Sequence, residues 1–391
     1  MTGDGAGPPG PAIRQWVLRL NPGYEIRADA AAPDDAGAGA DAYGQLVPRP
    51  GSGLAPRAIS TETALLLLTL RTAGPVPGYA VRAAGPDLAD DVRRLVLDGV
   101  LQVRDGAAFV HGPAALAALG LDPAAGAGAD GPPDLAVAAL RYAEQLIWLD
   151  EAALAQRLYT WGRQPVTPAL VRRWGPPARV RDRLGLGGTG AVERRLGPGW
   201  SPVPAPGDRP AWWQWLRTTV SVRDPRSTAM TPKLYVSPTV DRVADVLPEV
   251  VALVAGTSGC TGFKVGAGVA GLCRPDKIVL YAARPEDLQA LGWALAERIA
   301  GCPALPVPFT ARVTGDGLLS AGVDPPAAWA GGPLRRTSWR MWLAERLAEH
   351  LKAAADAGDG AAPWRFALAR MRLSGVDTTT WIPADTTWAD P

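Results

Sequence analysis

Lysine is rare in this sequence, and three of its lysines are concentrated in one stretch. Of 40 basic side chains only four are lysines, and Lys233, Lys264 and Lys277 all lie between residues 231 and 308. Arginine stays protonated at any working pH, whereas a buried lysine can lose its proton and act as a base. We therefore interpret this stretch as a candidate site of general-base chemistry. The alternative is that the three are ordinary surface cations.

Strands and helices alternate around these lysines. Side chains separated by two positions share one face of a strand, so Lys233 and Tyr235 are expected on one face, as are Lys277 and Tyr281. A further strand is expected to carry Lys264, and the glycines after it predict a loop over 266–272. The pattern predicts an α+β domain with one central sheet covered by two helices. The strands are expected at 233–237, 262–266, 277–281 and 307–313, and the helices at 239–255 and 285–301.

The composition argues against several classes of function. The net charge is +2 with 20% charged residues, so no overall field favours nucleic acid or an anionic membrane. The three cysteines form no CxxC pair, and the two histidines, His111 and His350, adjoin no nucleophile, which disfavours metal sites and His-dependent hydrolases. Without a signal-peptide pattern or a long apolar run, we expect a cytoplasmic protein.

Residues 1–112 predict a separate domain. After a Gly/Pro-rich tail, strands are expected at 16–26 and 43–47. Ser60 is a suitable N-cap for a helix, and shorter helices and a hairpin follow at 79–84, from Leu88, and around Asp105-Gly106. Three helices and a two-stranded wing are typical of a winged-helix unit, whose common function is DNA binding. The third helix carries more acid than base, which disfavours that function.

This N-terminal pattern resembles the PqqD-like peptide-recognition element of enzymes that modify ribosomal peptides. The similarity lies in Thr-x-x-Ala-Leu-Leu-Leu from Thr61 and in Asp-Val-x-x-Leu-x-x-x-Gly-Val-Leu from Asp91. The resemblance implies that a leader peptide is bound by addition as a strand to an exposed sheet edge. A purely structural cap is the alternative.

Residues 113–230 predict a mostly helical and loop-rich connecting region before the third domain, 231–391. Helices are expected at 133–148 and 151–159, and the many tryptophans that follow are interpreted as packing residues. The glycine run from Gly185 lacks both a preceding apolar strand and a following Lys-Ser/Thr, which argues against a phosphate loop.

The lysine stretch resembles the HopA-type effector domain family and, more distantly, the phosphothreonine lyases and the lyase domain of class III lanthipeptide synthetases. The motifs are Lys-Leu-Tyr-Val-Ser-Pro-Thr, Gly-Phe-Lys, Arg-Pro-Asp-Lys-Ile-Val-Leu-Tyr and Pro-Phe-Thr, between residues 231 and 325. The resemblance implies elimination of phosphate from phosphoserine or phosphothreonine, without a metal or redox cofactor. It also implies two partners, a precursor peptide with leader and phosphorylated core, and a separate kinase, as in class V lanthipeptide and thioamitide pathways.

Roles follow from matching positions in this family. Lys264 matches the base that removes the α-proton, Lys233 the lysine that polarises the carbonyl, and Arg274 and Tyr281 the following Arg and Tyr. Tyr235 replaces the family's histidine acid; a phenol can still donate a proton. We group Arg274 and Tyr281 with Lys277 as phosphate-binding candidates.

The C-terminal segment adds two candidate phosphate ligands. A helix is expected to begin near Arg335 and to continue to about Lys352, followed by another at 363–372. Arg336 and Arg340 lie one turn apart near its start, where the helix dipole also favours anions. The alternative is a solvated helix face.

Three functions remain open at this point. The first is a phosphate-eliminating lyase of ribosomal peptide maturation. The second is a non-catalytic partner that presents leader or phosphopeptide to a kinase, motivated by Tyr235. The third, a winged-helix regulator, is disfavoured by the acidic third helix.

Overall fold

A computed structural model describes residues 13–28, 41–84, 87–122, 135–188, 190–204, 210–219, 230–325, 338–358 and 362–384. The chain divides into two compact units, Met1–Gly131 with Glu349–Ser374 and Pro132–Ala348 with Gly375–Pro391. Each combines helices with antiparallel sheets, which confirms the predicted α+β class. The predicted N-terminal tail and Arg336 lie outside the described residues.

The first unit contains two three-stranded antiparallel sheets, ordered β2-β3-β4 and β1-β5-β6. The prediction of one strand over 16–26 is wrong. Asn21 interrupts it, because its side chain accepts from the Gly23 N–H (2.9 Å) and donates to the Gly99 carbonyl (2.7 Å). The strands are β1 (Leu18–Leu20), β2 (Tyr24–Ala28), β3 (Ala42–Pro48), β4 (Arg57–Ser60), β5 (Leu101–Asp105) and β6 (Ala108–Val110).

The helices of the first unit begin where the sequence predicts. The Ser60 hydroxyl accepts from the Thr63 N–H and caps the first helix, as expected. Apolar residues of these helices share one core with Phe366 and Leu373 of α13 (Pro363–Leu373). The other helices are α1 (Thr61–Thr69), α2 (Gly78–Ala84) and α3 (Leu88–Leu97).

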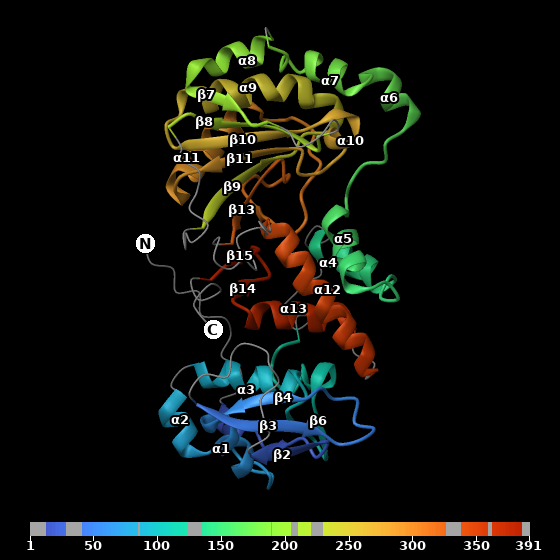
Figure 1. Ribbon diagram of the computed structural model, residues 1–391, viewed down its shortest axis with the longest axis vertical. Helices are drawn as coiled ribbons and strands as arrows, with labels where there is room; N and C mark the ends of the chain where they lie inside the picture. The colour runs from blue at the N-terminus through green and yellow to red at the C-terminus, as the bar shows by residue number, and fades with distance from the viewer. Residues whose placement is uncertain are drawn as a thin grey trace. The chain divides into compact units, whose positions relative to one another are not determined.

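The second unit is built on a seven-stranded antiparallel sheet with the order β12-β13-β9-β11-β10-β8-β7 (Figure 1). The sequence prediction missed β7 and β8, which come from the segment 113–230, and β13. The strand expected over 307–313 is reduced to β12. The strands are β7 (Trp200–Pro202), β8 (Trp212–Arg217), β9 (Thr231–Val236), β10 (Cys260–Gly266), β11 (Ile278–Ala282), β12 (Ala311–Arg312) and β13 (Leu319–Asp324).

The two faces of this sheet differ in chemistry because side chains alternate along each strand. On one face Phe263, Leu280 and Leu234 join the apolar core formed with α8 (Ala191–Leu196), α9 (Val243–Gly256) and α11 (Pro285–Arg298). Figure 1 shows α8 and α9 beside the strands. The register puts the polar and aromatic residues on the opposite face: Trp212, Lys233, Tyr235, Lys264, Tyr281, Ser320 and Asp324.

A short helix, α10 (Gly268–Leu272), occupies the segment predicted as a loop over 266–272. The chain can turn from β10 into this helix because the backbones of Gly266 and Gly271 approach each other closely. A Cβ on Gly271 would lie 2.4 Å from the Gly266 carbonyl carbon, so no side chain fits at that position. The helix ends two residues before Arg274 and so sets the position of the Arg274 backbone.

The remaining elements belong to the second unit, except that α12 belongs to the first unit from Glu349 onward. The 339–357 helix begins later than predicted, and the tail predicted as a strap forms two paired strands before residue 385. None of the described helices is long and apolar enough to cross a membrane. The elements are α4 (Leu135–Glu144), α5 (Glu151–Thr160), α6 (Pro168–Trp174), α7 (Pro177–Arg183), α12 (Trp339–Ala357), β14 (Val376–Asp377) and β15 (Ile382–Pro383).

Candidate active site

The sheet register brings two of the three singled-out lysines to one aromatic ring. Lys233 of β9 lies directly across from Tyr281 of β11, and Lys264 of β10 lies one strand further on. The Lys233 Nζ is 5.4 Å from the centre of the Tyr281 ring, and the Lys264 Nζ is 5.7 Å from it. Residues 31 positions apart in sequence, 233 and 264, are thus joined on one surface.

Lys264 is a partly buried amine whose pKa is lowered. Burial, and then the nearby charge of Lys233, lower the pKa of Lys264 from its ordinary 10.5 to about 8. Its ammonium lies 4.3 Å from the centre of the Trp212 ring, and it makes no hydrogen bond to any described residue. An amine with such a pKa is partly neutral near physiological pH, so it can accept a proton.

Lys233 is fixed by an ion pair. Its side chain is only 3% exposed, and its Nζ lies 2.5 Å from Oδ2 of Asp324. The other oxygen of Asp324 accepts a hydrogen bond from the Trp339 N–H at 2.8 Å, so the carboxylate is itself anchored to the first residue of α12. This arrangement fixes a positive charge beside Lys264 and is suited to stabilising a developing oxyanion.

Tyr235 is buried on the same face and stays protonated. Burial, followed by the charge of Asp324, raises the pKa of Tyr235 well above its ordinary 10. A Cβ on Gly322, in the neighbouring strand, would come within 3.4 Å of the Tyr235 hydroxyl, so the glycine leaves space for it. The phenol is therefore neutral and can donate a hydrogen bond; its expected role as the leaving-group acid stays a prediction.

Two arginines converge on one buried carboxylate. Arg274 donates through Nε and Nη2 to the two oxygens of Asp276, each at 2.9 Å, and Arg340 donates to Asp276 at the same distance. Although burial opposes ionisation, Arg340 and Arg274 hold the pKa of Asp276 well below its usual range. Arg340 is 1% exposed and also donates to the Pro308 and Tyr159 carbonyls.

Aromatic rings join the arginine cluster to the lysines. The Arg274 guanidinium lies 4.5 Å from the centre of the Trp212 ring, the same ring that Lys264 contacts. Arg274 also donates to the Tyr159 hydroxyl at 2.8 Å. With Lys264 neutral, as a base must be, Lys233, Arg274 and Arg340 carry three positive charges, and Asp276 and Asp324 carry two negative ones. One excess positive charge remains, which favours an anionic group such as a phosphate.

The other predicted site residues have different positions. Tyr281 lies between the lysines, and burial raises the pKa of its hydroxyl far above 10. Lys277 is fully buried and donates to the Pro238 carbonyl at 2.7 Å; within the described residues it forms no hydrogen bond, ion pair or ring contact with the group around Lys233 and Lys264. Burial lowers the pKa of Lys277 to about 7. Arg336 lies outside the described residues.

Sequence reasoning missed Asp276, Asp324, Tyr159 and Trp212. Asp276 was available as the third residue of the Arg-Pro-Asp-Lys motif. Trp212 begins the run Trp-Trp-Gln-Trp, whose period of two could have indicated a strand. Asp324 and Tyr159 carry no local signal, because they meet the site only through tertiary structure. In the described part of the chain no group of three or more His, Cys, Asp or Glu side chains is placed to hold a metal ion.

Comparison with known proteins gives structural likenesses only. No family model matches this sequence, and no curated protein does. An effector protein from Pseudomonas syringae pv. tomato strain DC3000 is 12% identical, with 65% of this chain and 98% of that chain covered and a TM-score of 0.42. An effector protein from P. syringae pv. syringae strain 61 is 16% identical, with 64% of this chain and 97% of that chain covered and a TM-score of 0.39.

A third solved structure carries a stated activity. The type III effector and phosphothreonine lyase OspF from Shigella flexneri is 13% identical, with 32% of this chain and 69% of that chain covered and a TM-score of 0.25. These TM-scores are all below 0.5, so what the site of this chain does must be inferred from its own residues.

Proposed function

We propose that this chain is a carbon–oxygen lyase that eliminates phosphate from phosphoserine or phosphothreonine in a peptide. The observation that carries the proposal is Lys264, an amine with a pKa lowered to about 8 that lies beside a cluster with excess positive charge. In this reaction the α-carbon loses a proton, a Cα=Cβ double bond forms, and the Cβ–O bond breaks. The products are dehydroalanine or dehydrobutyrine and inorganic phosphate.

Each proton and charge in this reaction has a residue to receive or supply it. Lys264 takes the α-proton, and Lys233, fixed by Asp324, stabilises the negative charge that develops on the amide oxygen. Tyr235, whose pKa is raised, donates a proton to the departing phosphate. Arg274 and Arg340 provide the positive charge that phosphate requires.

The substrate we propose is a ribosomal precursor peptide that a separate kinase has phosphorylated. The first unit would recognise its leader. In the sheet β2-β3-β4, strands β2 and β4 each pair with one described neighbour only, so each offers an edge to which a leader could add as a strand. Hydrogen exchange of the full chain with and without leader peptide tests this: new protection of 24–28 or 57–60 is expected, and none at either edge contradicts it.

The elimination itself is tested with a phosphorylated peptide and the purified chain. Loss of phosphoric acid from the peptide by mass spectrometry, together with released phosphate, is the expected result. An intact phosphopeptide after prolonged incubation would refute catalysis by this chain.

A second candidate function is phosphopeptide binding without chemistry, as a partner of the kinase. The favouring observation is Asp276, which already accepts hydrogen bonds from both Arg274 and Arg340. Binding of the phosphopeptide without any change in its mass would favour this function. Phosphate release would exclude it.

A further inference from the structure

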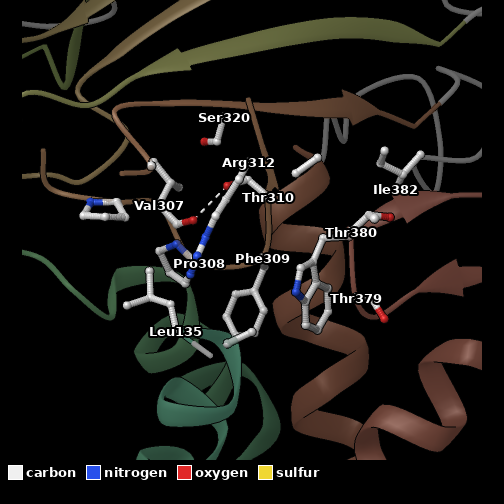
Figure 2. Close-up of a pocket in the computed structure, with 15 residues that line it drawn as sticks. Leu135, Val307, Pro308, Phe309, Thr310, Arg312, Ser320, Thr379, Thr380 and Ile382 are labelled. Carbon is white, nitrogen blue, oxygen red and sulfur yellow. Dashed lines mark hydrogen bonds between the residues drawn. The ribbon is translucent and has the colours of Figure 1, made fainter. Parts of the chain in front are cut away.

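A cavity of about 440 Å³ lies in the second unit, and two of its lining residues, Val307 and Ser320, adjoin Tyr235 of the candidate site. Its lining comes from residues 306–312, Leu135, Ser320 and residues 379–382, among others. Figure 2 shows Leu135, Pro308 and Phe309 on one side of it and Thr379, Thr380 and Ile382 on another. The volume falls in the range of about 300–1,000 Å³ that is usual for ligand sites.

Two aromatic residues of this cavity are held in an unfavourable backbone conformation. Phe309 has φ 60° and Trp381 has φ 57°, and within the described residues they are the non-glycine positions with positive φ. Their rings make an edge-to-face contact with centres 5.0 Å apart. Residues adopt this conformation only where their surroundings enforce it, and such positions cluster at functional sites. The surrounding structure therefore holds these two rings of the cavity wall in place.

Two polar side chains of the cavity, Ser320 and Arg312, have unsatisfied bonding capacity. The Ser320 hydroxyl is buried and has no hydrogen-bond partner among the described residues. Arg312 is exposed, forms no ion pair with any described residue, and carries the one charge among the lining side chains. Most of the rest of the lining is apolar. The complementary ligand is thus a large apolar group with a single negative charge next to it.

The cavity shares a wall with the lysine cluster. Val307 packs against Tyr235, and Ser320 lies opposite Tyr235 across the β13–β9 pair. The carbonyl of Pro308 accepts a hydrogen bond from Arg340, which also binds Asp276. A peptide advances about 3.3–3.6 Å per residue when extended, so we expect a flanking residue of a peptide bound beside Tyr235 to enter this cavity.

We propose that the cavity is a subsite that selects the sequence around the phosphorylated residue of the substrate. A large apolar side chain of the peptide fills it, and Arg312 pairs with a carboxylate of an adjacent peptide residue. A single exposed guanidinium suits a carboxylate, whereas the phosphate is met by the cation cluster around Lys264. This inference rests on the proposed function, because it takes a phosphorylated peptide as the substrate.

The test uses phosphothreonine peptides with glycine at every flanking position as the reference. Phenylalanine followed by aspartate is then placed at each pair of flanking positions in turn. Released phosphate gives kcat/KM for the full chain, and fluorescence anisotropy with the Lys264→Ala variant gives binding without turnover. At one placement we expect both quantities to favour the Phe-Asp peptide by about ten-fold or more.

A charge reversal tests the role of Arg312 directly. Arg312→Glu should abolish the preference for aspartate and favour a Phe-Lys peptide at the same placement, because the charge that selects is inverted. Arg195→Glu is the matched control, since Arg195 is an exposed arginine of α8 that does not line the cavity.

The outcomes separate this inference from the proposed function. Phosphate release without any flanking preference, or equal behaviour of Arg312→Glu and Arg195→Glu, overturns the subsite and leaves the lyase intact. Binding that depends on Phe-Asp and on Arg312, with no phosphate released from any peptide, overturns the lyase and retains the recognition site.

Discussion

Lys264 is the residue on which the proposed chemistry depends most. Replacing it with alanine removes the base, and we predict that elimination slows by on the order of 10²–10⁴-fold, the usual contribution of a positioned base. Phosphate release under single-turnover conditions measures this. Lys352→Ala, which removes the one lysine outside the 231–308 stretch, should leave the rate unchanged. A Lys264→Ala variant with normal activity would exclude Lys264 as the base.

The lowered pKa of Lys264 predicts a pH dependence of the rate. A base must be neutral to accept a proton, so kcat/KM should rise with pH and level off above about 8, the pKa to which burial and Lys233 lower this amine. An ordinary lysine would give a rise that continues toward pH 10. A profile that already falls between about pH 6 and 8 would contradict neutral Lys264 as the reacting form.

The site residues illustrate what a single sequence reveals. The lysines were found because their type is rare here, and Tyr235 and Tyr281 because they alternate with lysines along strands. Asp276 and Asp324 were missed although both bind predicted site residues, because acidic side chains are common in the chain and these give no local sign of burial. The pairing of Asp324 with Lys233 exists only in the folded chain, whereas Asp276 pairs with Arg274 two residues away as well as with distant Arg340.

At the level of elements, predictability followed the length of each apolar pattern. Strands β9, β10 and β11 and helices α9 and α11 were predicted because each has a clear period of two or 3.6, whereas the glycine-rich α10 was expected to be a loop. Strands β7 and β12 have only three and two residues, too short for a period, and β8 lies among proline- and glycine-rich segments. Strands β7 and β12 are the two edges of the sheet and β8 lies next to β7, positions that are decided by pairing with neighbouring strands.

The contact between β10 and α10 yields a prediction about stability. Gly271→Ala would force a Cβ into the Gly266 backbone, 2.4 Å away at the closest, so one of the two segments must shift. We predict a loss of about 1–3 kcal/mol in the free energy of unfolding, as for other overpacked positions. Urea denaturation measures it. The control is Gly256→Ala, where no atom lies within 4 Å of the added Cβ.

At the level of the whole molecule, removing the N-terminal segment is expected to damage more than peptide recognition. Phe366 and Leu373 of α13 share their core with residues between Trp16 and Leu119. Deleting residues 1–112 therefore exposes apolar surface on α13, and we predict an aggregated or insoluble product, checked by size-exclusion chromatography. A soluble, monodisperse truncation with native circular dichroism would contradict this.

Stability of the whole chain should also depend on pH through its buried amines. Burial lowers the pKa of Lys264 to about 8 and of Lys277 to about 7, whereas both are near 10.5 in an unfolded chain. Between these values the unfolded chain holds more protons, so the free energy of unfolding rises with pH. From pH 7 to about 9 we predict a gain on the order of 1 kcal/mol per amine.

Denaturation at several pH values, with a Lys264→Met, Lys277→Met double variant as control, measures this slope. The variant lacks both amines and should show little of the increase. The window ends near pH 9 because of Cys260. Burial raises the pKa of this thiol from its ordinary 9.0 to about 11, so between these values the folded chain holds more protons and the free energy of unfolding falls with pH. Stability that is constant or falls across the window would contradict the two lowered values.

The polar face draws its residues from five different strands: Trp212 from β8, Lys233 from β9, Lys264 from β10, Tyr281 from β11 and Asp324 from β13. A slip of one residue in any strand would turn its contribution into the apolar core. No misregistered or half-assembled chain can therefore display the whole set. After dilution from denaturant, the rate of phosphate release that is recovered would therefore measure the fraction of chains that have reached the native fold.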